Sequence, residues 1–350
     1  MVQRFKPDAQ HGQRRRRRLW LTILMGALLL CLLIILFFAL PLMRILPEPP
    51  AWVYAGEQIN AAAVIRWDTS DRGLEAVYRR LIQTELSARE SETLRRVIET
   101  LLYPRAWVFA RDGADAIDQT QVLAVAHVKR LAGWLQKALQ AALDAEAIEP
   151  VEKIGGVSLC ESPMGGWMAL TGRGLVWSSD KEWAVETAQT HGAMGRGAPR
   201  RTEASPEGFV QRCVELRGDN ELRVLVRMTP ARRSELEEAL LQGIGETAPL
   251  ELEDILAPQI KGLAGPVEAL DLDVDLRGDN ALSASFRLET ASPEAAGALA
   301  ARLTKLRADA AVLTASLGAT VGEIRTEDAS AVFSLDLTNL TPLFSALQDM

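Results

Sequence analysis

Histidine and cysteine are scarce in this chain, with three of each among 350 residues. His11, His127 and His191 have no second metal ligand at helical or strand spacing, so neither a zinc site nor a Ser-His-Asp triad is indicated. Glycine-rich phosphate-binding motifs are absent as well. Cys160 and Cys213 lie in the part expected outside the cytoplasm, where a single disulfide is permitted but not required. We therefore expect no cofactor and no metal. Whether the chain is an enzyme stays open, with the balance against it.

Charged residues are missing altogether from Leu19 to Leu40. At about 1.5 Å per helical residue this stretch reaches roughly 33 Å, enough to cross a hydrocarbon core of about 30 Å. The run predicts one transmembrane helix, which we place at residues 19–42. The main alternative is a signal peptide cleaved after Val53-Tyr54-Ala55, but its apolar region would be shorter and closer to the cleavage site.

Acidic residues are almost absent from residues 1–18, which hold seven Arg or Lys and one Asp, whereas the whole chain has a net charge of −7. Basic residues beside a membrane helix stay on the cytoplasmic side, and tryptophan prefers the interface. The residues predicted to orient the helix are Arg14, Arg15, Arg16, Arg17, Arg18 and Trp20. We therefore expect a cytoplasmic tail at 1–18, a single pass through the inner membrane, and the bulk of the chain outside the cytoplasm. The expected partner of the basic cluster is the lipid bilayer and not nucleic acid.

Proline and glycine mark the boundaries of the remaining chain. Pro47, Pro49 and Pro50 predict a stiff connector at residues 43–61. Residues 191–208 contain many chain breakers and no apolar periodicity, which is typical of a flexible linker. This linker separates a first half at 62–190 from a second half at 209–350.

Apolar periodicity in both halves predicts an α+β fold, with antiparallel-rich sheets and packed helices after the transmembrane helix. The clearest signal is a hairpin, in which apolar residues at 270–276 alternate with aspartates and a return strand runs over 282–288. Ser292 and Pro293 predict the start of a long helix with an apolar stripe that reaches Leu317. Further helical stripes are predicted at 74–82, 94–102 and 131–139.

The order of the predicted elements repeats along the chain. Each half reads as a strand, two helices, a hairpin, a helix, further strands and a short helix, with an offset of about 160 residues between corresponding elements. The repetition lies in element order and not in residue identity. We interpret it as an internal structural duplication.

Tryptophan is missing from the second half, since all eight precede residue 191. Packing in a core is one explanation. The other is a surface in the first half that stacks sugars or peptides, for which the candidate residues are Trp107, Trp167 and Trp177.

Three aspartates in the predicted hairpin imitate the start of a calcium-binding loop. Asp271, Asp273 and Asp275 have the right spacing, but Leu276 and Leu282 stand where such a loop needs a glycine and a bidentate glutamate. We therefore interpret the aspartates as the solvated face of a strand.

Two segments of the expected extracytoplasmic part carry a resemblance to known proteins. Ala63–Trp67 is typical of a first strand, and Gly174–Asp180 is typical of a strand that enters a helix. Together with the anchor, they resemble bacterial membrane-anchored extracytoplasmic proteins of unknown function. The resemblance implies a periplasmic location and transfers no catalytic residue.

Two classes of function are compatible with these patterns. The first is a non-catalytic binding or scaffold protein of the cell envelope, and the second is an envelope hydrolase whose catalytic carboxylates the linear sequence cannot pair. A subunit of a secretion or envelope complex is a third hypothesis, in which the helix from Leu299 to Leu317 packs against an envelope protein partner. The stripe on that helix would otherwise cover its own sheet.

Overall fold

A computed structural model gives the fold of the part that follows the predicted anchor. It describes residues 59–66, 102–111, 120–129, 150–154, 157–162, 165–171, 174–194, 208–214, 216, 221–247, 249–277, 280–316 and 318–340. The predicted membrane helix at 19–42, the predicted helices at 74–82 and 131–139 and most of the predicted linker lie outside these ranges. Within them, no helix has both the length and the apolarity that a membrane crossing requires.

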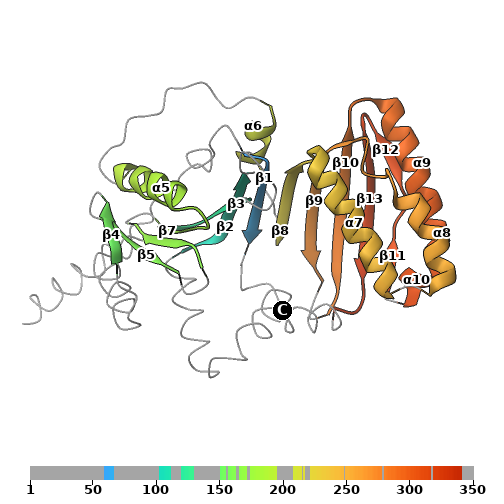
Figure 1. Cartoon of the computed structure of the whole chain (residues 1–350), viewed down its shortest axis with the longest axis horizontal. Coiled ribbons are helices and arrows are strands. Elements are labelled where there is room, and N and C mark those ends of the chain that lie inside the picture. The colour runs from blue at the N-terminus through green and yellow to red at the C-terminus, as the bar shows by residue number, and fades with distance from the viewer. Residues whose placement is uncertain are drawn as a thin grey trace, which may run out of the picture.

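The described strands form one antiparallel sheet (Figure 1). The thirteen strands of the described part are β1 (Ala61–Arg66), β2 (Leu102–Arg111), β3 (Gln121–Val128), β4 (Pro150–Ile154), β5 (Val157–Glu161), β6 (Trp167–Leu170), β7 (Gly174–Ser178), β8 (Leu222–Arg227), β9 (Val267–Leu276), β10 (Leu282–Thr290), β11 (Ala319–Val321), β12 (Arg325–Glu327) and β13 (Ser330–Leu337). Their spatial order is β11-β13-β10-β9-β8-β1-β2-β3-β7-β6-β5-β4, and β12 also pairs with β13. The prediction of an α+β fold with an antiparallel sheet is confirmed.

The strand order is mirrored about the central pair of β1 and β8. Outward from this pair come β2, β3 and β7 on one side and β9, β10 and β13 on the other. β1 and β8 begin at Ala61 and Leu222, and β3 and β10 begin at Gln121 and Leu282, so both pairs are offset by the same 161 residues. The chain therefore follows the same path through the sheet on each side.

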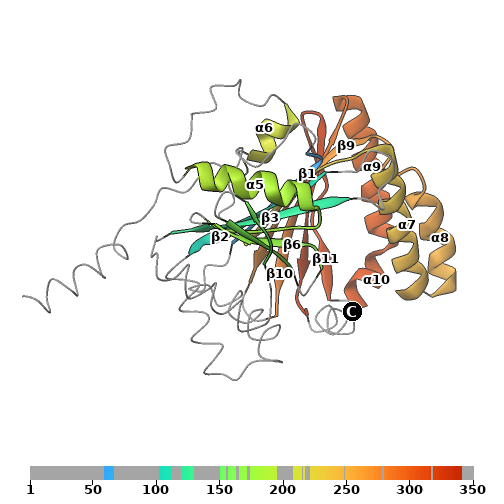
Figure 2. The ribbon, with the colours of Figure 1, turned by 60° about the vertical axis from the view of Figure 1, so that its left-hand side comes forward.

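The helices of the described residues cover opposite faces of the sheet in its two parts. They are α5 (Lys181–Met194), α6 (Phe209–Val214), α7 (Pro230–Thr247), α8 (Leu250–Ile260), α9 (Pro293–Asp309) and α10 (Ala311–Ser316). Leu225 belongs to the core beneath α5 and α6, whereas Val226 packs into the core beneath α7 and α9. Because consecutive side chains of a strand point to opposite faces, the two cores lie on opposite sides of one sheet. Figure 2 shows α5 and α6 over one part of the sheet and α7, α8 and α9 over the other.

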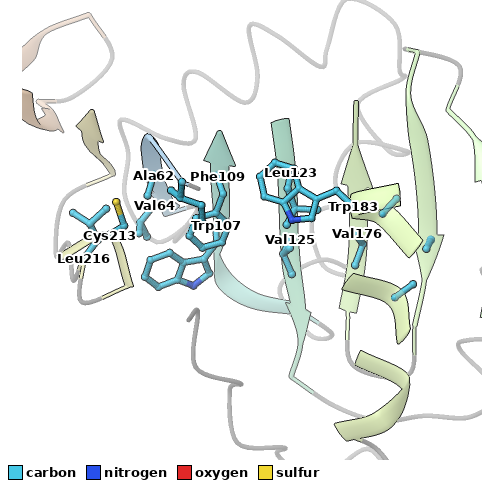
Figure 3. Packing of buried hydrophobic residues seen from close by; sticks show 14 of the residues in the cluster. Ala62, Val64, Trp107, Phe109, Leu123, Val125, Val176, Trp183, Cys213 and Leu216 are labelled. Carbon is cyan, nitrogen blue, oxygen red and sulfur yellow. The ribbon is translucent and has the colours of Figure 1, made fainter. Parts of the chain in front are cut away.

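The first core is formed by aligned side chains of neighbouring strands (Figure 3). Val64 lies opposite Trp107 in the β1–β2 register, and Trp107 lies opposite Val125 in the β2–β3 register. These residues and Trp183 of α5 are each at most 5% exposed. Burial of such apolar surface, at about 25 cal/mol per Å², is the main term that holds α5 to the sheet.

Helix α6 belongs to this first core, although sequence analysis assigned residues 209–350 to the second half. Val210, Cys213 and Leu216 are buried in the same cluster as Val64 of β1, and α6 contacts β1. The predicted linker therefore does not mark the border between the two cores, because the first core recruits residues on both sides of it.

The second core lies between the helix layer and strands β8, β9, β10 and β13. Met228, Val267, Leu299 and Ala331 are buried there. Leu303 and Leu306 of α9 pack against this core as well. The stripe on α9 therefore covers the sheet of its own chain.

Polar contacts fix the helix layer of this part. The Glu237 carboxylate of α7 accepts hydrogen bonds from the backbone N–H groups of Gly262 and Ala264, each at 2.9 Å. The Arg302 guanidinium of α9 donates to the carbonyl oxygens of Gln259, Lys261 and Gly262, at the end of α8. A cation there satisfies carbonyl groups that have no partner within the helix.

Several predicted elements are found where expected. The hairpin of β9 and β10 places Leu282 opposite Leu276 and Ser285 opposite Asp273, which confirms the predicted alternation. Pro293 opens α9, and the Ser292 hydroxyl accepts a hydrogen bond from the Ala295 N–H at 3.2 Å. The predicted capping residue is confirmed.

Three predicted boundaries are wrong. Leu102, the last residue of the helical stripe predicted at 94–102, opens β2 instead, and Tyr103 before Pro104 is restricted to extended backbone; the rest of that stripe lies outside the described residues. Helix α5 continues to Met194, four residues into the predicted linker, since one internal glycine costs a helix only about 1 kcal/mol. The helix predicted up to Leu317 breaks at Ala310, where ψ is 0°, and α10 then contacts β11.

Candidate binding groove

The structure separates the three tryptophans that sequence analysis grouped as ligand-stacking candidates. Trp107 is 5% exposed within the first core. Trp167 lies opposite Ser178 across the β6–β7 pair, while Trp177 precedes Ser178 in β7. The rings of Trp167 and Trp177 therefore lie on opposite faces of the sheet and share no stacking surface.

Local contacts also occupy the two less buried tryptophans. The Lys181 ammonium lies 5.0 Å from the ring centroid of Trp167, and the Trp177 indole N–H donates to the Gly165 carbonyl at 3.0 Å. Such cation–π and hydrogen-bond contacts stabilise the strand ends near α5. The remaining predicted site residues, Arg14 to Arg18 and Trp20, lie outside the described residues.

Residues that could carry chemistry are dispersed. In the described ranges, no group of three or more His, Cys, Asp or Glu side chains could hold a metal ion. His127 is fully buried in β3. Cys160 and Cys213 are both buried free thiols, and burial raises the pKa of the Cys213 thiol to about 12.

The three aspartates of β9 lie on the polar face of the sheet, which is the face turned away from α7 and α9. Asp273 faces Arg223 of β8 and Ser285 of β10 in the strand registers. The Arg223 guanidinium donates to both carboxylate oxygens of Asp271, at 3.3 and 3.0 Å. This bond raises the pKa of Arg223 above its usual value. The polar face is thus cross-linked by its own ion pairs, and the strand alternation explains the aspartate pattern without calcium.

A groove lies beside the short strand β11, between that strand and helices α9 and α10. Its volume is about 550 Å³, within the range of about 300–1,000 Å³ that ligand sites occupy. The lining residues are Thr304, Arg307, Ala308, Ala311, Thr314, Ala315, Ala319, Thr320 and Val321. Eight of these nine side chains are small or β-branched and uncharged. They protrude little, so an extended chain could lie along the groove.

β11 is the last strand on its side of the described sheet. The Gly322 N–H donates to the Ser334 carbonyl at 2.8 Å, and the Thr338 N–H donates to the Gly318 carbonyl at 3.0 Å. Hydrogen-bonded pairs recur at every second residue of an antiparallel ladder, so between these two pairs Thr320 faces β13. The backbone N–H and C=O groups of Ala319 and Val321 therefore point away from β13, and both residues also line the groove.

Arg307 supplies the groove's charge. It is the single charged residue of the lining, and it forms no ion pair with the residues that the structure describes. The nearby charges on the edge strands are compensated. Arg325 pairs with Glu323 at 2.7 Å, and Glu327 pairs with Arg287 at 2.6 Å. The Arg307 guanidinium, which is exposed, can bind a carboxylate in a two-point geometry.

The sequence pattern alone does not indicate this groove. The apolar stripe predicted one helix up to Leu317, so the break at Ala310 that forms the groove was missed. Two weak signals were present in the sequence, namely the alanine-rich run from Ala308 to Ala315 and the β-branched pair of Thr320 and Val321 next to it. Neither signal identifies a groove until the helix and the edge strand are placed side by side.

Comparison with known proteins returned no relative. No protein-family model, no curated protein and no solved structure matches this chain.

Proposed function

We propose that this chain is a membrane-anchored, extracytoplasmic protein that acts as a non-catalytic binding or scaffold protein of the cell envelope. The basic residues at 1–18 and the uncharged run from Leu19 to Leu40 support the anchored topology. The groove beside β11 supports the binding role and is the observation on which it rests. It combines a volume of about 550 Å³ with outward backbone groups and one exposed arginine.

The fold supports a scaffold in a further respect. We infer that the two sides of the sheet descend from an internal duplication, because β1-β2-β3-β7 and β8-β9-β10-β13 have the same order. Antiparallel pairing of the equivalent strands β1 and β8 relates the two copies by an approximate two-fold axis. An experimental structure in which these two sets of four strands do not superpose would remove this inference.

The topology can be tested with protease added to spheroplasts of cells that express the tagged full-length chain. Digestion of the folded part without lysis is expected, together with protection of a tag at the N-terminus. A folded part that resists protease until the membrane is broken would contradict the proposed topology.

The binding role can be tested by crosslinking in intact cells, followed by purification of the tagged chain and mass spectrometry. Reproducible recovery of one or two envelope proteins is the expected result. Recovery of the chain alone, at a crosslinker concentration that captures known envelope complexes, would overturn the binding role and favour small-molecule chemistry.

A further inference from the structure

The edge of the sheet at β11 has the chemistry to bind another strand. The N–H and C=O groups of Ala319 and Val321 point away from β13, and both residues line the groove. Extended peptides recognise such an edge through main-chain hydrogen bonds, while pockets beside it select alternate side chains. An edge of this kind is also an aggregation hazard unless it is short or covered. β11 is three residues long, which suits a peptide of a few residues better than a full strand of another sheet.

The opposite edge of the sheet carries additional strands at the position that corresponds to β11. On the other side, β7 is followed outward by β6, β5 and β4. At the corresponding place, β13 is followed by β11 and β12 alone within the described residues. Three strands in succession thus extend the sheet beyond β7. Beyond β13, the described sheet has only the short strands β11 and β12, which both pair with β13.

The walls of the groove leave space for the side chains of a bound segment. Ala308, Ala311 and Ala315 line the helix side, where larger residues would fill the volume. Val312 follows Ala311 and is 80% exposed, the highest exposure among the large apolar side chains of the described part. Val312 itself does not line the groove, so the three alanines are the residues that leave space for peptide side chains.

Charge decides which peptide fits best. The residues after position 18 carry an excess of acidic groups, yet among the described residues the groove lining holds one cation and no anion. The two other charged residues near the end of α9 differ from Arg307. Asp309 accepts a hydrogen bond from Gln259 at 2.7 Å, and Lys305 does not line the groove. The local field therefore favours a carboxylate at Arg307.

On these grounds we propose that the groove binds an extended peptide segment of an envelope protein, which adds as a strand to β11 and places a carboxylate on Arg307. The carboxylate belongs to an Asp or Glu side chain or to the C-terminus of the segment. This inference rests on the proposed binding role and names the site and the chemistry of the partner.

The test selects phage-displayed random octapeptides, with free or blocked C-termini, on the full-length chain in nanodiscs. Peptides with one acidic position or a free C-terminal carboxylate are expected. Arg307→Glu should weaken binding of a selected fluorescent peptide by about tenfold or more, because it replaces a charge-assisted hydrogen bond with repulsion. Lys305→Glu, on the same helix but outside the groove, should change the affinity by less than about twofold.

Three further measurements separate a direct contact from a general effect of charge. Replacing the acidic residue of the peptide by Lys should restore binding to the Arg307→Glu variant. Val321→Pro removes an outward N–H and should abolish binding, whereas Val321→Thr keeps that group and should retain it. Hydrogen exchange should slow at Ala319 and Val321 when the peptide binds. Circular dichroism and melting temperature check that each variant is folded.

The outcomes distinguish the two proposals. If a partner is crosslinked in cells as strongly by Arg307→Glu and Val321→Pro as by the natural chain, the binding role stands and the peptide site is wrong. If no octapeptide is selected, or if selected peptides bind all variants equally, the site is also wrong. Crosslinks between two copies through residues 319–321 would replace the partner peptide by a second copy of this chain. Loss of both peptide binding and captured partners would overturn both proposals.

Discussion

Arg223 and Asp271 form a diagonal ion pair between neighbouring strands. In the register of β8 and β9, Arg223 lies directly opposite Asp273, yet its guanidinium donates two hydrogen bonds to Asp271, two residues away. Diagonal neighbours on an antiparallel pair are within reach of a long side chain. One oxygen of Asp273 is consequently buried without a hydrogen-bond partner among the described residues. Two aspartates of the same alternating pattern therefore have different energetic roles.

The first prediction compares these two aspartates. Asp271→Ala should lower the free energy of unfolding by about 1 kcal/mol, because it removes a two-point hydrogen bond to a half-buried cation. Asp273→Ala should cost less than about 0.5 kcal/mol, because it also relieves the burial of an unpartnered oxygen. Urea unfolding of both variants measures the difference. A larger loss for Asp273→Ala would show that direct register decides the pairing.

The second prediction concerns two adjacent glycines before β6. Gly165 and Gly166 both have positive φ, at 82° and 77°. A Cβ at Gly165 would meet open space, whereas at Gly166 it would lie 2.5 Å from the Ser178 carbonyl oxygen. Gly165→Ala should therefore cost about 1 kcal/mol from backbone strain alone, and Gly166→Ala clearly more. Thermal melting of the matched pair gives the comparison, and equal melting temperatures would contradict this packing.

The third prediction concerns thiol reactivity. Cys160 and Cys213 are buried and free, and burial holds Cys213 in its neutral form. Because the thiolate is the reactive species, neither residue should be alkylated by iodoacetamide at pH 8 in the folded protein. Peptide mass spectrometry should find both modified after denaturation without a reductant. Recovery of a peptide that joins Cys160 to Cys213 would contradict the free thiols.

The fourth prediction follows from the pKa of Cys213, which rises from 9.0 to about 12 on folding. Between these values the unfolded chain releases a proton that the folded chain retains. Stability attributable to this thiol is therefore complete below pH 9 and is lost as the pH rises towards 12. Unfolding measured from pH 8 to 10.5 should lose more stability in the natural chain than in Cys213→Ala. Parallel curves would show that Cys213 titrates normally.

The fifth prediction tests the cap of α9. Ser292→Ala should lower the free energy of unfolding by about 1 kcal/mol, because the Ala295 N–H loses its partner. Ser292→Asn restores a side-chain acceptor and should recover most of that loss. Chemical unfolding of the three proteins is sufficient. Equal losses in both variants would mean that the hydroxyl acts through something other than the cap.

Short-range sequence patterns predicted the elements that depend on residues close together in the chain. The hairpin of β9 and β10 was predicted because apolar residues alternate with aspartates, and one face must be buried whatever lies around it. The cap at Ser292 was predicted because its hydrogen bond spans three residues. The boundaries at Met194 and Ala310 were missed, because a helix ends where tertiary contacts stop favouring it, and propensity alone decides this weakly. The strand at Leu102 was missed although the restriction before Pro104 is visible in the sequence.

By itself, the sequence determined the class of the fold, the core-facing side of each strand in the hairpin and the capped start of α9, because these depend on periodicity and short-range hydrogen bonds. Only the tertiary structure decided that β1 pairs with β8, that α6 packs in the core of the first part and that Trp167 and Trp177 point apart. The groove is a tertiary feature for the same reason. It exists because the helix breaks at Ala310 and because β11 is placed by its pairing with β13, a tertiary contact that leaves no periodic signal in the chain.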